Sequence, residues 1–350
     1  FTDAEKAIAI AKETHKKSEW KHNRHLRYKA LNELADRFEE NAERLKKILM
    51  LENGKIAAEA DFEISLVAPK LRYYAAQTLT DHGRALETKP GKFSMVLTGS
   101  IGVAGIIAPW NSPVILMIRS LAPALAAGCT AVIKMPGQTA QINFVISEIM
   151  SFATSIPKGV LNLFTETGSA GAALMVESPD VPTISYTGST PTGRILMRNG
   201  AQNLKRFGFE LGGKTPMLVF NDANLEIALP TLEKAITVFA GQFCMTGSRI
   251  LVQREISDLF IQEFSKRMEN VKVGPAADLT SDMGPVIDKA NVDRIDKEVE
   301  KAIKEGAEVL VRGGKIVEGT LASGSFYRPT LLKVKDNSLD IIQKETFGPV

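Results

Sequence analysis

Cysteine and histidine are scarce in this sequence, and both shortages limit the chemistry that it can perform. The 350 residues include 2 cysteines, Cys129 and Cys244, and 4 histidines. Two unrelated cysteines give no disulfide framework and are typical of a reducing compartment. The histidines are His15, His22, His25 and His82. They lie in charged segments that predict helices or turns, so a papain-like cysteine–histidine pair is not indicated.

Dense charge of one sign and long apolar runs are missing as well. The net charge is +3, and no basic tract is dense enough to suggest a nucleic-acid partner. No apolar run is long enough to cross a bilayer, and the first residues do not form a signal peptide. With 44% hydrophobic and 24% charged residues, the composition is that of a globular protein whose length favours two domains. The sequence therefore predicts a soluble, cytoplasmic protein without nucleic-acid or membrane partners.

The order of the expected elements predicts an α/β fold. Apolar residues recur at helical spacing over residues 2–79, which predicts three helices. Strand-like and helical segments then alternate from 109 to 211, which predicts a parallel sheet covered by helices, with ligands at the carboxyl ends of its strands. The expected strands are 131–134, 160–164, 183–186 and 206–209, and the expected helices are 114–127, 139–153, 169–177 and 190–200.

A second α/β block is expected after Gly212. It contains expected strands at 217–220, 250–252 and 309–311 and expected helices near 225–238, 255–270 and 287–305. We therefore assign 1–81 and 101–211 to a first domain and 212–350 to a second domain. The extended segment 82–100 predicts a β-hairpin, which is either an arm for oligomerisation or a plain surface hairpin. The final residues resemble a loop that begins a further element, so the C-terminus is expected to be truncated.

Cys244 is the candidate nucleophile. It lies within Gly241–Arg249, among small and polar residues where a thiol could meet a substrate. Cys129, in contrast, is predicted to be a small core residue that enters a strand. A thiol with a pKa near ~8.5 is mostly protonated at neutral pH and needs local help to react. Because a lone cysteine is usually buried and inert, Cys244 needs partners from the rest of the chain.

Two side chains at expected strand ends could be such partners. Asn111 follows a strand in the stretch 109–113, where its amide could hold a developing oxyanion, although an Asx turn or a helix cap is an equally ordinary use. Glu210 is flanked by apolar residues at the end of another strand. Burial would raise the pKa of its carboxyl group and suit a general base, whereas hydrogen bonds to neighbouring amides are the structural alternative.

Two further stretches could bind a nucleotide. Lys134 closes a buried strand and could hold a ribose hydroxyl or a phosphate, or could simply be solvated. Tyr186–Gly193 forms a strand–turn–helix junction, and the first N–H groups of its helix are a good setting for a pyrophosphate. Neither this junction nor the glycines Gly99, Gly102 and Gly105 have the spacing of the common dinucleotide fingerprint.

Gly208–Thr215 matches the pattern of a P-loop by letter. A phosphate-binding loop must open directly into a helix, whereas here Pro216 and an expected strand follow. The loop interior also carries the bulky Phe209 and Leu211. We therefore reject nucleoside-triphosphate hydrolysis.

Together these stretches resemble the aldehyde dehydrogenase superfamily. Six matches follow the family's order along the whole chain: Pro109-Trp110-Asn111, Lys134, Tyr186–Thr190 with Gly193, Glu210–Lys214, Gly241–Cys244 with Ser248-Arg249, and Glu345–Val350. The resemblance implies that Cys244 attacks an aldehyde while Asn111 and the Cys244 amide hold the oxyanion. The adduct would pass a hydride to a nicotinamide and leave a thioester. Water activated by Glu210 would hydrolyse that thioester to a carboxylic acid.

The resemblance also implies an NAD or NADP cofactor and a homodimer or homotetramer, and it implies no metal. Lys134 would bind the adenosine ribose, Ser189 the pyrophosphate, and Glu345 and Phe347 the nicotinamide ribose and ring. The other implied cofactor contacts are Ile107, Ala108, Pro109, Trp110, Gly137, Gly188, Gly193 and Leu211.

The chain departs from the family pattern at two positions that bear on specificity. Gly137 stands where members that prefer NAD usually carry a glutamate, so NADP is expected to be accepted. Arg119-Ser120 replaces the usual Trp-Lys pair, as in the branch that acts on benzaldehyde, salicylaldehyde and vanillin. Arg119 would either steer a substituent on an aromatic ring or form a structural ion pair. The alternatives are an aliphatic or amino-aldehyde substrate of the betaine-aldehyde type and a catalytically silent relative that acts as a binding protein.

Overall fold

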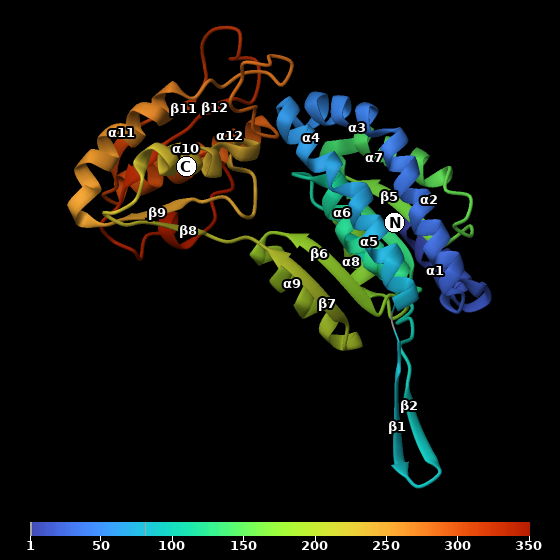
Figure 1. The fold of residues 1–350 in the computed structure, drawn as a ribbon. Helices are drawn as coiled ribbons and strands as arrows, with labels where there is room; N and C mark the ends of the chain where they lie inside the picture. Colours follow the sequence, from blue (N-terminus) through green and yellow to red (C-terminus); the bar gives the residue numbers. More distant parts are fainter. Residues whose placement is uncertain (1, 81) are drawn as a thin grey trace. The chain divides into compact units, whose positions relative to one another are not determined.

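The computed structural model describes residues 2–80 and 82–350, and the chain divides into two compact units (Figure 1). The first unit comprises the residues up to Ile48 and Asp61–Leu211, and the second comprises Leu49–Ala60 and Gly212–Val350. The expected division places all of 1–81 in the first domain, whereas the structure groups 49–60 with the second unit. Glu59 explains this difference, since its carboxylate accepts a hydrogen bond from the amide of Phe239.

A five-stranded parallel sheet forms the centre of the first unit and confirms the predicted α/β fold. Its strands are β3 (Val103–Ile107), β4 (Thr130–Pro136), β5 (Leu161–Glu166), β6 (Thr183–Gly188) and β7 (Arg206–Leu211). The spatial order is β5-β4-β3-β6-β7, with every neighbouring pair parallel. All five strands therefore end at one edge of the sheet. The chain reverses its direction of travel across the sheet beside β3, which is where sheets of this kind bind ligands.

Helices cover both faces of this sheet, so its central strand, β3, is apolar along its whole length. Every residue of β3 is buried, as expected for a parallel strand with helices on both sides. One face is covered by α1 (Thr2–Lys17), α8 (Ala170–Glu177) and α9 (Thr190–Gly200), and the other by α6 (Pro113–Ala126) and α7 (Ala140–Ser151). This packing holds the strand ends, and the loops that follow them, in fixed register.

The N-terminal region contains more helices than its periodicity predicts. Within residues 2–80, α1 is followed by α2 (Arg24–Glu40), α3 (Ala42–Ile48), α4 (Ala57–Ser65) and α5 (Val67–Thr80), so the prediction of three helices is wrong. Single residues, Asn41 and Leu66, separate α2 from α3 and α4 from α5. Because helical spacing continues almost unchanged across a one-residue break, the apolar pattern could not locate either of them.

A β-hairpin extends from the first unit (Figure 1). Its strands are β1 (Arg84–Lys89) and β2 (Lys92–Val96), which pair antiparallel. Gly91 has a φ of +75° in the connecting turn, a conformation that glycine adopts without strain. Every residue of both strands is exposed, including Phe93, of which 71% is accessible. The hairpin therefore presents apolar side chains that no described residue of the first unit covers.

The second unit combines short sheets with four helices among its described residues. β8 (Pro216–Val219) pairs parallel with β9 (Arg249–Val252), β10 (Glu308–Val311) pairs antiparallel with β13 (Leu331–Lys333), and β11 (Gly314–Lys315) pairs with β12 (Tyr327–Arg328). The helices are α10 (Leu225–Thr237), α11 (Ser257–Asn270), α12 (Lys289–Lys304) and α13 (Asp340–Gln343). Apolar residues of α10 and α11 pack on β8 and β10 to form its main core. Across both units, no helix built from described residues has the length and apolar content needed to cross a membrane.

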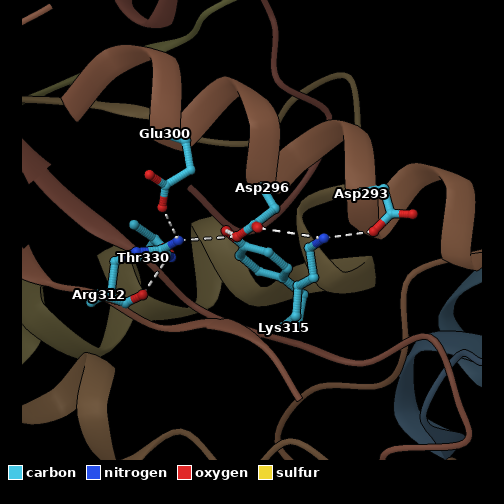
Figure 2. A network of polar contacts seen from close by, with 7 residues as sticks. Asp293, Asp296, Glu300, Arg312, Lys315 and Thr330 are labelled. Carbon is cyan, nitrogen blue, oxygen red and sulfur yellow. Dashed lines mark hydrogen bonds and ion pairs between the residues drawn. The ribbon is translucent and has the colours of Figure 1, made fainter. Parts of the chain in front are cut away.

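Ion pairs join α12 to β11 and to Arg312, which directly follows β10 (Figure 2). Nη2 of Arg312 lies 2.7 Å from Oε1 of Glu300 and 3.1 Å from Oδ1 of Asp296. Nζ of Lys315 lies 2.6 Å from Oδ1 of Asp293. The three acidic residues are spaced three and four apart and so share one helix face. Because most of these groups are partly exposed, each pair contributes only about 0–1 kcal/mol. The network fixes the orientation of α12 more than it stabilises the unit.

Candidate active site

Asn111 lies on the short segment between β3 and α6 and is buried, with 6% of its surface accessible. A different residue caps α6. The carboxylate of Glu63 accepts hydrogen bonds from the amides of Val114 (2.9 Å) and Ile115 (3.2 Å). The first N–H groups of the helix are thus satisfied without Asn111, which disfavours the helix-cap interpretation of this residue. Sequence reasoning missed Glu63. Its local signal is a glutamate placed between the apolar Phe62 and Ile64 of α4.

Glu210 lies on β7, the edge strand of the sheet, and faces away from the core. Residues alternate along β7 between exposed and half-buried, so Phe209 packs inward while Glu210 points outward. The expectation that Glu210 is buried among apolar neighbours is therefore wrong, since 60% of its side chain is accessible. Adjacent residues of a strand point to opposite faces, so apolar neighbours in sequence do not bury the residue between them.

Arg119 on α6 contacts both Glu210 and the neighbouring strand. Its Nη1 lies 3.5 Å from Oε2 of Glu210, and its Nη2 donates to Oγ1 of Thr187 at 2.9 Å. Thr187 and Glu210 are register partners on β6 and β7, so a single guanidinium spans the ends of both strands. Arg119 therefore forms the ion pair that is one of its two expected roles. The pair holds the Glu210 carboxylate at the carboxyl edge of the sheet.

Lys134 and Glu166 lie at the ends of neighbouring strands, β4 and β5. Lys134 is half-buried, and this burial lowers the pKa of its ammonium group, an effect that the charge of Glu166 partly offsets. The carboxylate of Glu166 accepts hydrogen bonds from the amides of Gly171 (2.8 Å) and Ala172 (3.1 Å) at the start of α8. A negative charge is favourable there because of the helix dipole. Sequence reasoning also missed Glu166, the acidic residue that ends β5.

Gly137 follows β4 and leaves no room for a side chain. A Cβ atom at this position would lie 2.6 Å from Cγ2 and 2.9 Å from Cα of Thr167. Any larger residue would therefore displace the backbone at Thr167. The packing of the segments after β4 and β5 thus leaves no space for a carboxylate side chain at position 137.

The junction between β6 and α9 is a strand–turn–helix connection, as the sequence predicts. Ser189 is the N-cap of α9, and its Oγ accepts from the amide of Thr192 at 3.4 Å. Gly193 is buried, and a Cβ there would lie 2.9 Å from Cδ2 of Leu211, so α9 packs directly on β7. The remaining implied cofactor contacts lie nearby in sequence at the ends of β3 and β6: Ile107, Ala108, Pro109, Trp110 and Gly188. The strand ends of the first unit, with the segments and helix starts that directly follow them, thus carry the implied site residues that precede Gly212.

Gly208–Leu211 of the apparent P-loop belong to β7, and β8 begins at Pro216. The glycines of the pattern are therefore divided between a strand and a connection to another strand. No helix follows the lysine and threonine, which agrees with our rejection of a phosphate-binding loop.

Cys244 lies in the second unit, after a turn of unusual backbone conformation. Phe239 and Ala240 have φ values of 53° and 52°, and Gly241 has a φ of 71°. Left-handed backbone at a residue other than glycine costs about 1–3 kcal/mol and persists only where the surroundings enforce it. Such strain is concentrated at functional sites, which supports the assignment of a function to this turn.

Several buried groups enforce the turn before Cys244. Oε1 of Glu59 accepts a hydrogen bond from the amide of Phe239 at 2.7 Å, and Nζ of Lys55 lies 3.7 Å from the centre of the Phe239 ring. Gln242 donates from its side chain to the carbonyl of Phe239 at 3.0 Å. Burial raises the pKa of Glu59, opposed by the amide of Phe239 and by the positive charges of Lys234 and Lys55. None of these contacts was predicted from the sequence.

The segment that contains Glu345 and Phe347 packs against the same turn. A Cβ at Gly241 would overlap the carbonyl of Gly348, so the two backbones touch. Arg294 on α12 donates to the carbonyls of Thr346 (2.7 Å) and Phe347 (3.3 Å). Within the second unit, the structure therefore brings the loop of the candidate nucleophile next to the loop of two implied cofactor residues.

Glu345 itself is directed toward the backbone at Gly212 and Gly213. Its carboxylate accepts from the Gly213 amide, and burial raises its pKa. Among the described residues, its Oε1 atom is buried without a hydrogen-bond partner. Lys214 is the residue after Gly213, and burial lowers the pKa of its ammonium group to about 8. A buried acceptor without a donor is suited to a ligand hydroxyl.

Known proteins provide an independent comparison. The sequence model of the aldehyde dehydrogenase family matches residues 2–350. The chain is 35% identical over 350 residues to betaine aldehyde dehydrogenase of Bacillus subtilis, covering 99% of this chain and 71% of that protein. It is also 35% identical over 316 residues to a probable succinate-semialdehyde dehydrogenase [NADP(+)] of Sinorhizobium fredii, covering 89% of this chain and 63% of that protein.

A solved structure agrees with these sequence matches. Betaine aldehyde dehydrogenase of Staphylococcus aureus in complex with NAD+ superposes with a TM-score of 0.96 at 34% identity. The superposition covers 99% of this chain and 69% of that one. The chain therefore belongs to the aldehyde dehydrogenase family, the NAD(P)-dependent oxidoreductases that its sequence resembles.

Proposed function

We propose that this protein oxidises an aldehyde to a carboxylic acid with NAD(P)+, through a covalent intermediate on Cys244. The observation that carries the proposal is the strained turn at Phe239–Gly241. It is held by buried groups, it directly precedes the thiol, and it packs against the segment of Glu345 and Phe347. Sustaining such strain around an inert cysteine would serve no purpose, whereas a nucleophile requires a fixed direction of attack.

Three residues carry the proposed chemistry. The thiolate of Cys244 adds to the carbonyl carbon, and the side-chain amide of Asn111 with the Cys244 N–H stabilises the oxyanion. After oxidation the acyl group remains on Cys244 as a thioester. Glu210 then takes a proton from a water molecule, which attacks the thioester and releases the acid and the free thiol. The exposure of Glu210 gives it access to that water.

The residues present fit a nicotinamide cofactor. Lys134 and Ser189 would bind the adenosine ribose and the pyrophosphate, and the buried Oε1 of Glu345 would accept a hydrogen bond from the nicotinamide ribose. Phe347 would support the nicotinamide ring. When bound, NAD(P)+ supplies the acceptor for the hydride that leaves the substrate carbon.

An aromatic aldehyde is the proposed substrate, on the basis of Arg119-Ser120. The guanidinium of Arg119 is held by Glu210 and Thr187 and remains 33% accessible, so it is fixed at the carboxyl edge of the sheet. A planar cation of this kind can stack on an aromatic ring or pair with a phenolate. The alternative is an aliphatic aldehyde, which the substrates named for the Bacillus subtilis and Sinorhizobium fredii relatives support.

Absorbance of the reduced nicotinamide tests the function directly. We expect turnover of aldehydes with both NAD+ and NADP+, with benzaldehyde and salicylaldehyde preferred over betaine aldehyde and succinate semialdehyde. Equal or better turnover of the aliphatic compounds would reject the aromatic proposal. An absence of turnover with every aldehyde would reject the enzymatic function itself and favour a silent binding protein.

Coenzyme preference is expected to depend on Glu166, because Gly137 cannot carry a carboxylate without displacing Thr167. Glu166→Gln removes a negative charge beside Lys134 and keeps an acceptor for the α8 amides. We expect the ratio of kcat/KM for NADP+ to that for NAD+ to rise roughly tenfold. Glu177→Gln, at the exposed end of the same helix, is the matched control. An unchanged ratio in Glu166→Gln would contradict this assignment.

We further propose that the hairpin β1–β2 pairs with a second copy of the chain. Exposed apolar residues on both strands, among them Leu86 and Phe93, favour such pairing. We expect a dimer or tetramer by sedimentation, and a monomer at micromolar concentration would contradict the proposal.

A further inference from the structure

Glu59 is a buried charged residue that the proposed mechanism does not use. It lies near the start of α4, and only 4% of its surface is accessible. One carboxylate oxygen, Oε2, accepts from the amide of Ile56 at 3.2 Å and caps its own helix. The other oxygen, Oε1, accepts from the amide of Phe239 at 2.7 Å, across 180 residues of sequence. The bond to Ile56 caps α4. The bond to Phe239 has no part in that cap and needs a separate explanation.

The second bond reaches the first residue of the left-handed turn. Phe239 and Ala240 would both relax toward right-handed or extended backbone if nothing held them. Phe239 is fixed at three places: its amide by Glu59, its carbonyl by Gln242 and its ring by Lys55 and Phe243. The bond from Glu59 holds the N–H of the peptide that enters the turn.

The same turn determines where the thiol lies. Only Gln242 and Phe243 separate Gly241 from Cys244, and both are anchored. The carbonyl of Phe243 accepts from Oγ1 of Thr246 at 2.5 Å, and Oε1 of Gln242 accepts from the amide of Ile287 at 2.9 Å. Phe239 is itself coupled to both residues, since its carbonyl accepts from the Gln242 side chain and its ring packs edge-on against Phe243. A rotation at Phe239 would therefore displace both residues and, with them, the peptide of Cys244. That peptide supplies one of the two proposed oxyanion donors.

We propose that Glu59 is a positioning residue for the reaction, because its carboxylate holds the Phe239 amide and thereby sets the direction of the Cys244 thiol and N–H. This inference rests on the proposed catalytic role of Cys244. It assigns to the segment 49–60 a role in aldehyde oxidation, although that segment touches neither cofactor nor substrate in the mechanism above.

Two substitutions test the proposal. Glu59→Gln keeps one oxygen acceptor, and Glu59→Ala removes both. We expect kcat to fall about tenfold in the first and about 100-fold in the second, because small displacements of a reacting group cost factors of this size. The dissociation constant of NAD(P)+ is expected to stay within twofold in both. The matched control is Glu33→Gln, a carboxylate that accepts from the amides of Thr154 and Ser155 and lies in the first unit.

Alkylation of Cys244 by iodoacetamide gives a readout that does not depend on turnover. Mass spectrometry of the Cys244 peptide separates its labelling from that of the buried Cys129. We expect the labelling rate to change more than threefold in Glu59→Gln and to stay unchanged in Glu33→Gln, although both variants lose some thermal stability. An unchanged labelling rate and kcat in Glu59→Gln would overturn the inference, even if the variant melts at a lower temperature.

A second substitution asks whether Glu59 acts through the left-handed turn. Glycine adopts positive φ without strain, so Ala240→Gly reduces the need for an external clamp. Added to Glu59→Gln, it is expected to restore most of the lost kcat. A failure to restore kcat would overturn the proposed route. Inactivity of the unmodified protein toward all aldehydes, together with altered labelling in Glu59→Gln, would reject the proposed function but retain the role of Glu59 in placing the thiol.

Discussion

We expect Cys244→Ala to abolish aldehyde oxidation, with kcat/KM falling by roughly 10⁴-fold or more, as for the loss of other covalent nucleophiles. Alanine cannot form the adduct from which a hydride leaves, and no other cysteine can replace Cys244. Cys129 is 3% accessible, and its carbonyl accepts from the indole of Trp20 at 3.0 Å. The measurement is the rate of reduced-nicotinamide formation with the best aldehyde.

Cys129→Ala is the matched control for this experiment. Cys129 packs in the core, where Oγ of Ser100 lies 3.6 Å from its sulfur, so we expect a loss of thermal stability without a loss of kcat. Binding of NAD(P)+ to Cys244→Ala should remain unchanged, since none of the proposed cofactor contacts is removed. If Cys244→Ala kept more than about one hundredth of the activity, a covalent mechanism at this residue would be wrong.

Glu210→Gln is expected to separate the two halves of the reaction. Acylation of Cys244 does not need the carboxylate, so one equivalent of reduced nicotinamide should form rapidly in the first turnover. Steady-state turnover should then fall by roughly 10²–10⁴-fold, the usual contribution of a general base. The thioester on Cys244 should accumulate and be detectable as an added mass on its peptide.

Two outcomes would contradict the role given to Glu210. If both the burst and the steady state disappeared, the residue would be needed for acylation as well. If the steady state were unchanged, another group would activate water. Glu226→Gln, at the exposed start of α10, controls for the loss of a carboxylate as such. Arg119 keeps its bond to Thr187 in Glu210→Gln, so that end of the guanidinium stays in place.

The parallel sheet of the first unit could be predicted from sequence because its signals are local. Strand-like segments alternate with segments of helical length, and four of the five strands, β4 to β7, lie within two residues of their expected limits. The nearest neighbours of Cys244 and Glu345 in sequence also carry the family resemblance, so those residues could be named in advance. The local sequence pattern was sufficient wherever a feature depends on the residues of one element alone.

Contacts between distant segments could not be predicted in this way. Glu59 looks like an ordinary helix residue until Phe239, 180 positions later, lies beside it. Glu210 has apolar neighbours in sequence, yet its position on an edge strand leaves it exposed. From sequence, Gly137 marks only the loss of a carboxylate that relatives carry. The structure shows that Thr167 occupies the space that a side chain at 137 would need. In each case the deciding neighbour comes from another element.

The bond between Glu59 and Phe239 also has a consequence for biosynthesis. Residues 49–60 leave the ribosome early, but their partners in the second unit are made only after some 180 further residues, about 10–40 s later at ordinary rates of translation. Until then the carboxylate of Glu59 lacks the Phe239 amide from which it accepts a hydrogen bond in the folded protein. The bond can form only after Phe239 has been made, and a fragment that starts at Gly212 would never acquire it.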